Sequence, residues 1–169
     1  MITWQCLAFN QLNTLQLYQM MMLREEVFVV EQNCPYQDAD GKDLQAKHVM
    51  AYRDGELVAY ARIYTSESLS AHIGRVVTKA SARGTGLGQQ LMQQAISQCQ
   101  QHWPNATIHI SAQRYLEDFY QGLGFVICSE PYLEDNIPHI GMEIRANDLG
   151  CGVIRVTPDE NQDESLAKQ

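Results

Sequence analysis

Apolar side chains recur at helical intervals in the first part of the chain. Residues 12–32 contain no Gly or Pro, and their apolar or aromatic side chains stand whole turns apart, at Leu15, Tyr18, Met22 and Val29. This spacing predicts a helix, to which the β-branched run at residues 27–30 gives a strand-like end. Residues 33–47 contain Pro, Gly and three aspartates, so we expect an ordered loop there.

Two further helices are predicted in the second half of the chain. Residues 86–102 form an amphipathic pattern before Pro104, with glutamines opposite an apolar face of Leu87, Leu91, Ala95, Ile96 and Cys99. Residues 115–123 are expected to form a short helix that ends at Gly124, because Gly favours the residue after a helix.

The strand signals lie between and after these helices. Asp54-Gly55 is a strong turn signal, so the segments on either side of it are expected to form a hairpin. The predicted strands are residues 48–53, 57–64, 72–78, 107–112, 125–129 and 137–145. The predicted elements follow the order helix, strands, helix, strand, helix and strands. This order favours an α/β (α+β) domain, with a mixed sheet covered by helices.

The length of 169 residues fits one domain, which we place at residues 1–150. Residues 151–169 form a C-terminal extension that is polar, and it is expected to be flexible from about residue 157. The five cysteines form an odd set without a C-x-x-C pair, and the N-terminal segment lacks the features of a secretory leader. Both observations favour the reducing cytoplasm.

The net charge of −8 argues against a general nucleic-acid binder and against a polybasic protein of the membrane surface. No apolar run approaches the ~18 residues of a membrane span. The charge is uneven, however, because residues 68–116 contain four basic side chains and no acidic one. This stretch is therefore expected to bind an anion. We expect the partner of the protein to be a small molecule or a peptide.

The segment Arg83-Gly84-Thr85-Gly86-Leu87-Gly88 follows a predicted strand and opens a predicted helix. Glycines allow close approach of the backbone, and the N–H groups of a helix's first turn bind anions, so a phosphate is the natural ligand. The spacing fits neither the P-loop nor the dinucleotide fingerprint G-x-G-x-x-G. A nucleoside triphosphatase and an NAD-binding protein are thereby disfavoured.

The R-x-x-G-x-G pattern of this loop resembles that of the GNAT superfamily of acetyl-CoA-dependent N-acyltransferases. Arg75-Val76-Val77 before the loop and the segment F-Y-Q-G-L-G-F at residues 119–125 agree with it. The segments V-F-V-V-E-Q, C-P-Y, S-A-Q and E-D-N-I-P-H-I resemble the ElaA-like group of that superfamily. The resemblance covers about residues 3–146 and implies a mostly antiparallel sheet with helices on both faces.

The resemblance implies acetyl-CoA as acyl donor and no metal. In such proteins a bulged strand exposes amides that hold the pantetheine arm, so Val76 and Val77 would contact it and the Val77 N–H would be an oxyanion donor. The loop and Gln89 would hold the pyrophosphate. The full implied cofactor set is Val76, Val77, Arg83, Gly84, Thr85, Gly86, Leu87, Gly88, Gln89, Gln113, Phe119 and Tyr120.

Amine attack on a thioester requires one group to deprotonate the amine and another to meet the leaving thiolate. Tyr120 stands where the family commonly has its tyrosine acid, and a core aromatic at helical spacing is the alternative role. Its ordinary pKa of ~10 exceeds the ~8.5 of a thiol, so hydrogen bonding to the sulfur is the expected action. The candidate bases are Glu31, His109, Asp135 and His139, among which His109 reads better as a structural histidine.

The leading hypothesis is thus an N-acetyltransferase acting on a primary amine of a small molecule or peptide. A non-catalytic acyl-CoA-binding or regulatory module of the same fold is the alternative, because no base stands out. An anion-binding scaffold for a protein partner is a third. A homodimer stays open, and no metal motif is found: Asp38, Asp40 and Asp43 miss the calcium-loop spacing and read as turn and cap residues.

Overall fold

The computed structural model describes residues 1–66 and 69–146, so the predicted extension at 151–169 lies outside the described residues. One sheet carries all described strands in the order β1-β2-β3-β4-β5-β8-β6, with β7 paired to β8. Every pairing is antiparallel except β4 with β5. The strands are β1 Ile2–Ala8, β2 Lys47–Arg53, β3 Glu56–Ser66, β4 Ser70–Thr78, β5 Thr107–Gln113, β6 Val126–Ile127, β7 Tyr132–Glu134 and β8 Ile137–Ile144.

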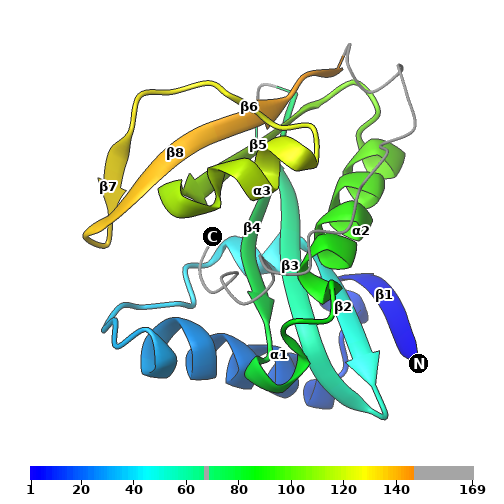
Figure 1. Cartoon of the computed structure of the whole chain (residues 1–169). Helices are drawn as coiled ribbons and strands as arrows, with labels where there is room; N and C mark the ends of the chain where they lie inside the picture. Colours follow the sequence, from blue (N-terminus) through cyan, green and yellow to red (C-terminus); the bar gives the residue numbers. More distant parts are fainter. Residues whose placement is uncertain (67–68, 147–169) are drawn as a thin grey trace.

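Helices cover both faces of this sheet, as expected (Figure 1). On one face α1 (Thr14–Arg24) packs its buried Met20 and Leu23 against β2 and β3. On the other face lie α2 (Leu87–His102) and α3 (Glu117–Gly122). The predicted apolar face of α2 is buried in full, which confirms the helical pattern. The fold class predicted from the sequence is confirmed.

The predicted strand-like end at residues 27–30 is wrong, because these residues continue α1 as a π-helical segment, Glu25–Glu31. Val27 and Phe28 are buried against the same cluster as Met20, together with Met50 and Tyr60. Packing along one helical face therefore outweighs the β preference of this run.

The sequence pattern also missed two strands and overextended one. β1 is an edge strand that alternates exposed and half-buried side chains, and β7 is exposed throughout, so neither carries a strong apolar signal. β6 covers only residues 126 and 127 of the predicted 125–129. In the part of the chain that the structure describes, no helix is long and apolar enough to cross a membrane.

Two irregularities of β4 position the site. β4 pairs with β5 only from Ser70 to His72, and beyond this point the two strands diverge, as Figure 1 shows. β4 also bulges where it faces β3: the register shifts between Tyr60 and Arg62, and Arg75 adopts a left-handed φ of 50°. A bulge beside a gap in the sheet leaves backbone groups of β4 without a strand partner on one side.

Candidate active site

The glycine loop joins the end of β4 to α2. Gly84 and Gly86 have φ values of 74° and 76°, which favour glycine, and no atom lies within 4 Å of where a Cβ would stand. Gly86 is the residue before α2 and offers no side-chain cap to its first turn. The Thr85 hydroxyl donates to the Ala82 carbonyl at 2.8 Å and holds the loop. The loop thus presents the helix terminus in the form that binds phosphates.

Arg83 is used differently from the prediction that it grips a phosphate. Its Nη1 and Nη2 donate to both carboxylate oxygens of Glu31 at 2.5 and 3.0 Å, and Nε and Nη2 donate to the Thr78 carbonyl. The arginine therefore ties the loop to the end of the π-helical segment. Both carboxylate oxygens of Glu31 are thus bonded to Arg83, and the role of Glu31 as a general base stays a prediction.

The backbone of β4 directs the N–H of Val77, the predicted oxyanion donor, toward β3. Val77 pairs with Tyr60 of β3, and the Lys79 N–H donates to the Val58 oxygen at 2.8 Å. Since alternate residues of a strand direct their N–H groups to the same side, the Val77 N–H points to β3. The backbone of Thr78 faces the opposite side, where its carbonyl meets Arg83.

Tyr120 lies on α3, which packs against β5, and its side chain is fully buried. Phe119 and Phe125 meet its ring edge to face, with centroids 5.1 and 5.9 Å away. Its hydroxyl has no hydrogen-bond partner among the described residues. Burial raises the pKa of Tyr120 well above its ordinary value, with Tyr115 adding to the rise, so the hydroxyl keeps its proton.

A cavity of about 440 Å³ opens where β4 and β5 diverge, a volume suited to a small molecule. We call it the β4/β5 pocket. Its lining comes from β3, β4, β5, the loop after the π-helical segment and the turn between β7 and β8. The residues are Tyr36, Asp40, Lys42, Arg62, Tyr64, His72, Ile73, Gly74, Arg75, His109, Ile110, Ser111, Glu134 and Asp135.

At one end of this pocket Glu134 meets the predicted base His139. His139 is 1% exposed, its Nδ1 lies 2.7 Å from the Ile137 carbonyl, and its Nε2 lies 3.3 Å from Glu134 Oε2. Nδ1 must carry a proton to bond a carbonyl, so Nε2 is the basic nitrogen. The Ser111 hydroxyl also donates to Glu134, at 3.0 Å. His139 is thus connected to the pocket through Glu134, which lines it. The sequence did not single out Glu134 as a base.

A closed ring of six ion pairs lies against the other side of the pocket. Each of three arginines bonds two aspartates, at N–O distances of 2.6 to 3.5 Å. Around the ring the residues are Arg24, Asp38, Arg75, Asp40, Arg62 and Asp43. The aspartates are therefore ion-pair partners, and Asp40 also has the predicted turn role, because its Oδ1 accepts from the Lys42 N–H at 3.0 Å. The ring also fixes the left-handed bulge residue Arg75.

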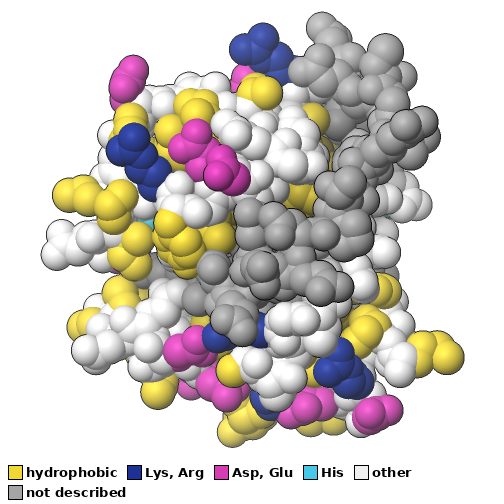
Figure 2. Space-filling view, in the orientation of Figure 1, with side chains coloured by type: hydrophobic (Ala, Val, Ile, Leu, Met, Phe, Trp, Pro, Cys, Tyr) yellow, Lys and Arg dark blue, Asp and Glu magenta, His cyan; other side chains and the backbone are white. Residues whose placement is uncertain are grey.

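The basic stretch of the sequence is largely compensated in space. Arg75 and Arg83 bond aspartates and a glutamate from other segments, and Lys79 bonds Glu56. On the face shown in Figure 2, acidic and basic side chains of the described residues stand next to one another. The stretch at 68–116 is thus no broad anion surface, and anion affinity rests on the loop and the start of α2.

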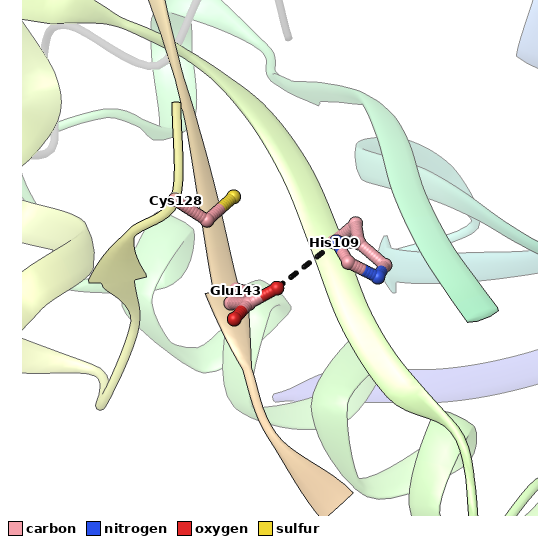
Figure 3. A group of neighbouring side chains, drawn as sticks. All are labelled: His109, Cys128 and Glu143. Atoms are coloured by element: carbon pink, nitrogen blue, oxygen red, sulfur yellow. Dashed lines mark ion pairs between the residues drawn. The ribbon is translucent and has the colours of Figure 1, made fainter. Parts of the chain in front are cut away.

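His109 belongs to a second group of polar residues, shown in Figure 3. Its Nδ1 lies 3.6 Å from Glu143 Oε2, and with the Cys128 sulfur these ligand atoms lie within 4.8 Å of one another. Such a set can hold a soft divalent cation. The sequence expectation of no metal stays a prediction, and spacing alone could not reveal a trio drawn from β5, β8 and the residue after β6. The pairing with Glu143 agrees with a structural role for His109.

Residues 10–146 match the model of the acetyltransferase (GNAT) domain. The chain belongs to the GNAT acetyltransferase family. The GNAT fold that the sequence motifs implied is confirmed.

Relatives of the GNAT chain agree in sequence and structure. Protein ElaA of Escherichia coli K12 is 48% identical over 146 residues, which cover 84% of this chain and 95% of ElaA. The crystal structure of E. coli ElaA matches with a TM-score of 0.81 and covers 85% of this chain and 99% of that one. The predicted resemblance to the ElaA-like group is thereby confirmed.

Two further solved structures share this fold. An acyl-CoA N-acyltransferase from Pseudomonas aeruginosa is 45% identical, with a TM-score of 0.81, and covers 85% of this chain and 99% of that one. A GNAT family acetyltransferase from Elizabethkingia anophelis, solved with acetyl-CoA bound, is 14% identical with a TM-score of 0.59. It covers 84% of this chain and 94% of that one, and at this identity it shows the fold alone.

Proposed function

We propose that the protein transfers an acetyl group from acetyl-CoA to a primary amine of a small molecule or peptide. The observation that carries this proposal is the hydroxyl of Tyr120, which is fully buried and has no partner among the described residues. Leaving a buried hydroxyl unpaired costs roughly 1–3 kcal/mol, so such a group marks a place where a ligand completes the hydrogen bonding. A thiol sulfur fits this position in a GNAT protein.

Tyr120 would stabilise the sulfur as the acyl–sulfur bond breaks. Its hydroxyl stays protonated at neutral pH because burial raises its pKa. It therefore acts as a hydrogen-bond donor toward developing negative charge and need not lose its proton completely. Phe119 and Phe125 fix the direction of the ring and exclude water from it.

The loop and β4 would hold the acyl donor, which supplies the thioester. Gly84 to Gly88 and the start of α2 suit the pyrophosphate, with Gln89 beside them, and Arg83 holds the loop from behind. The backbones of Val76 and Thr78 suit the pantetheine arm. The Thr78 N–H takes the oxyanion role predicted for Val77, since its side of β4 faces away from β3. Gln113, also a member of the implied cofactor set, is the last residue of β5 and is 3% exposed.

Glu134 and His139 would take the proton of the amine. Glu134 is half exposed in the β4/β5 pocket, so it can meet a cationic amine directly. Its neighbour His139 has Nε2 directed at the same carboxylate and can accept the proton or stabilise it there. Asp135 lines the same end of the pocket and serves to attract the cation.

Release of CoA from acetyl-CoA in the presence of a panel of primary amines tests the proposal. We expect amine-dependent thiol release and an increase in Tm on addition of CoA. Tyr120→Phe should lower kcat by about 10²-fold or more, with the CoA-dependent Tm shift retained. Tyr18→Phe, at an exposed tyrosine of α1, is the matched control and should leave kcat unchanged.

No turnover with any amine would overturn the proposal. If CoA still raised Tm under those conditions, and Tyr120→Phe behaved as the parent protein, the chain would instead be a non-catalytic acyl-CoA-binding module. If inorganic phosphate raised Tm as much as CoA did, the loop would be a simple anion site.

A further inference from the structure

The charges that line the β4/β5 pocket differ between its two ends. Asp40, Arg62 and Arg75 belong to the ion-pair ring and neutralise one another with its other members. Apart from the members of the ion-pair ring, the lining residues that can carry a charge near neutral pH are Lys42 and two histidines at one end, and two carboxylates at the other. The pocket therefore separates positive from negative charge, which a simple amine would use only in part.

The positive end is built as a stack of rings under an ammonium group. Lys42 Nζ lies 5.4 Å from the centroid of the Tyr64 ring, which stacks on His72 at 5.0 Å. His72 in turn stacks on His109 at 5.5 Å. Lys42 has no ion-pair partner among the described residues, so it is available to a ligand. Burial, with smaller effects of His109 and Lys42, lowers the pKa of His72, so Lys42 is the charge that attracts an anion here.

The negative end lies on the neighbouring strands. Glu134 accepts from Ser111 and lies next to His139, and Asp135 follows it in the turn. Ser111 is two residues along β5 from His109, on the same face, so Glu134 lies on the β5 side of the pocket, whereas Lys42 lies over Tyr64 of β3. A carboxylate bound by Lys42 and an amine bound by Glu134 would thus lie on different sides of one pocket.

We propose that the acceptor carries a carboxylate as well as the primary amine. Lys42 binds the carboxylate and Glu134 receives the amine. The inference rests on the proposed function and narrows its substrate class to primary amines that also carry a carboxylate.

Initial rates with 5-aminopentanoate, 5-aminopentanamide, pentylamine and glycine test this inference. We expect kcat/KM for 5-aminopentanoate to exceed that for 5-aminopentanamide by about tenfold or more, because a charge-assisted bond is lost in the amide. Lys42→Gln should bring this ratio to about one. Lys47→Gln, which removes the same charge at the start of β2 and away from the pocket, is the matched control and should keep the ratio.

Two results would overturn the inference while the proposed function stands: equal use of acid and amide by the parent protein, or an unchanged ratio in Lys42→Gln. Absence of thiol release with all four amines, pentylamine included, would instead count against the acetyltransferase itself.

Discussion

Two buried polar features of the described residues differ in how they are bonded. In the ion-pair ring, three guanidinium groups each bond two carboxylates, and its member Arg24 is fully buried. At Tyr120, a fully buried hydroxyl has no bond to any described residue. The paired charges hold the loop, β3 and β4 together, whereas the hydroxyl is the group that we propose meets the CoA sulfur. The comparison contrasts polar groups that stabilise the fold with one that we assign to the reaction.

Removing one member of the ring should give the largest change in stability. Asp38 is bonded by both Arg24 and Arg75, so Asp38→Ala leaves a buried guanidinium with half of its compensation. We expect the free energy of unfolding in urea to fall by about 3–5 kcal/mol. Glu56→Gln, at the exposed partner of Lys79, should cost less than ~1 kcal/mol. A similarly small loss of stability for both substitutions would show that the ion-pair ring does not stabilise the fold.

The ring should also make stability depend on pH in the acid range. The Arg62 guanidinium lowers the pKa of Asp40, and the pKa of Asp43 is lowered by Arg24 and Arg62 although burial opposes it. A carboxyl whose folded pKa is lowered stabilises the fold above its unfolded pKa of ~3.9, and this gain is lost as the pH falls through the folded value.

Protonation of His48 also lowers the stability of the fold as the pH falls, and it does so at a higher pH than protonation of the aspartates. Burial lowers its pKa, so the unfolded chain binds a proton there that the folded chain refuses once the pH drops below ~6.5. Urea unfolding from pH 8 to pH 3 should therefore show a decline that begins below about pH 6.5 and steepens below about pH 4. Stability that is level down to pH 3 would contradict this explanation.

On the ligand side of the comparison, Gly86→Ala should affect both stability and binding. An alanine at φ 76° costs about 1–2 kcal/mol, even though no atom lies within 4 Å of the new Cβ. Since the strain displaces the start of α2, we expect weaker CoA binding by isothermal titration calorimetry. Gly122→Ala adds a Cβ in equally open space without a left-handed φ, and it should leave CoA affinity unchanged.

The smallest expected effect has the opposite sign. Tyr120→Phe removes a buried hydroxyl that has no partner, so the free energy of unfolding without ligand should stay level or rise by ~1 kcal/mol. Urea denaturation of the ligand-free protein measures this change. A loss of more than ~1 kcal/mol would show that the hydroxyl is part of the structure, as the aspartates of the ring are.

Local patterns in the sequence were sufficient for α2 and the loop but not for the end of the first helix, where the β-branched run predicted a strand. The face of α2 and the glycines at 84 and 86 follow rules that act within a few residues, and the GNAT resemblance added the mostly antiparallel sheet. Pairings over long distances were not predictable: Arg83 meets Glu31 from 52 residues away, and Arg75 meets Asp38 from 37 residues away. The direction of the Val77 N–H was not predictable either, because it depends on strand register, which the motif does not encode.

A crystal structure of the protein with CoA bound tests the central claim most directly. The account predicts that the CoA sulfur lies within hydrogen-bond distance of Tyr120 Oη, with the pyrophosphate at the start of α2. A sulfur that lies away from Tyr120, with the hydroxyl still unpaired in the complex, would contradict it.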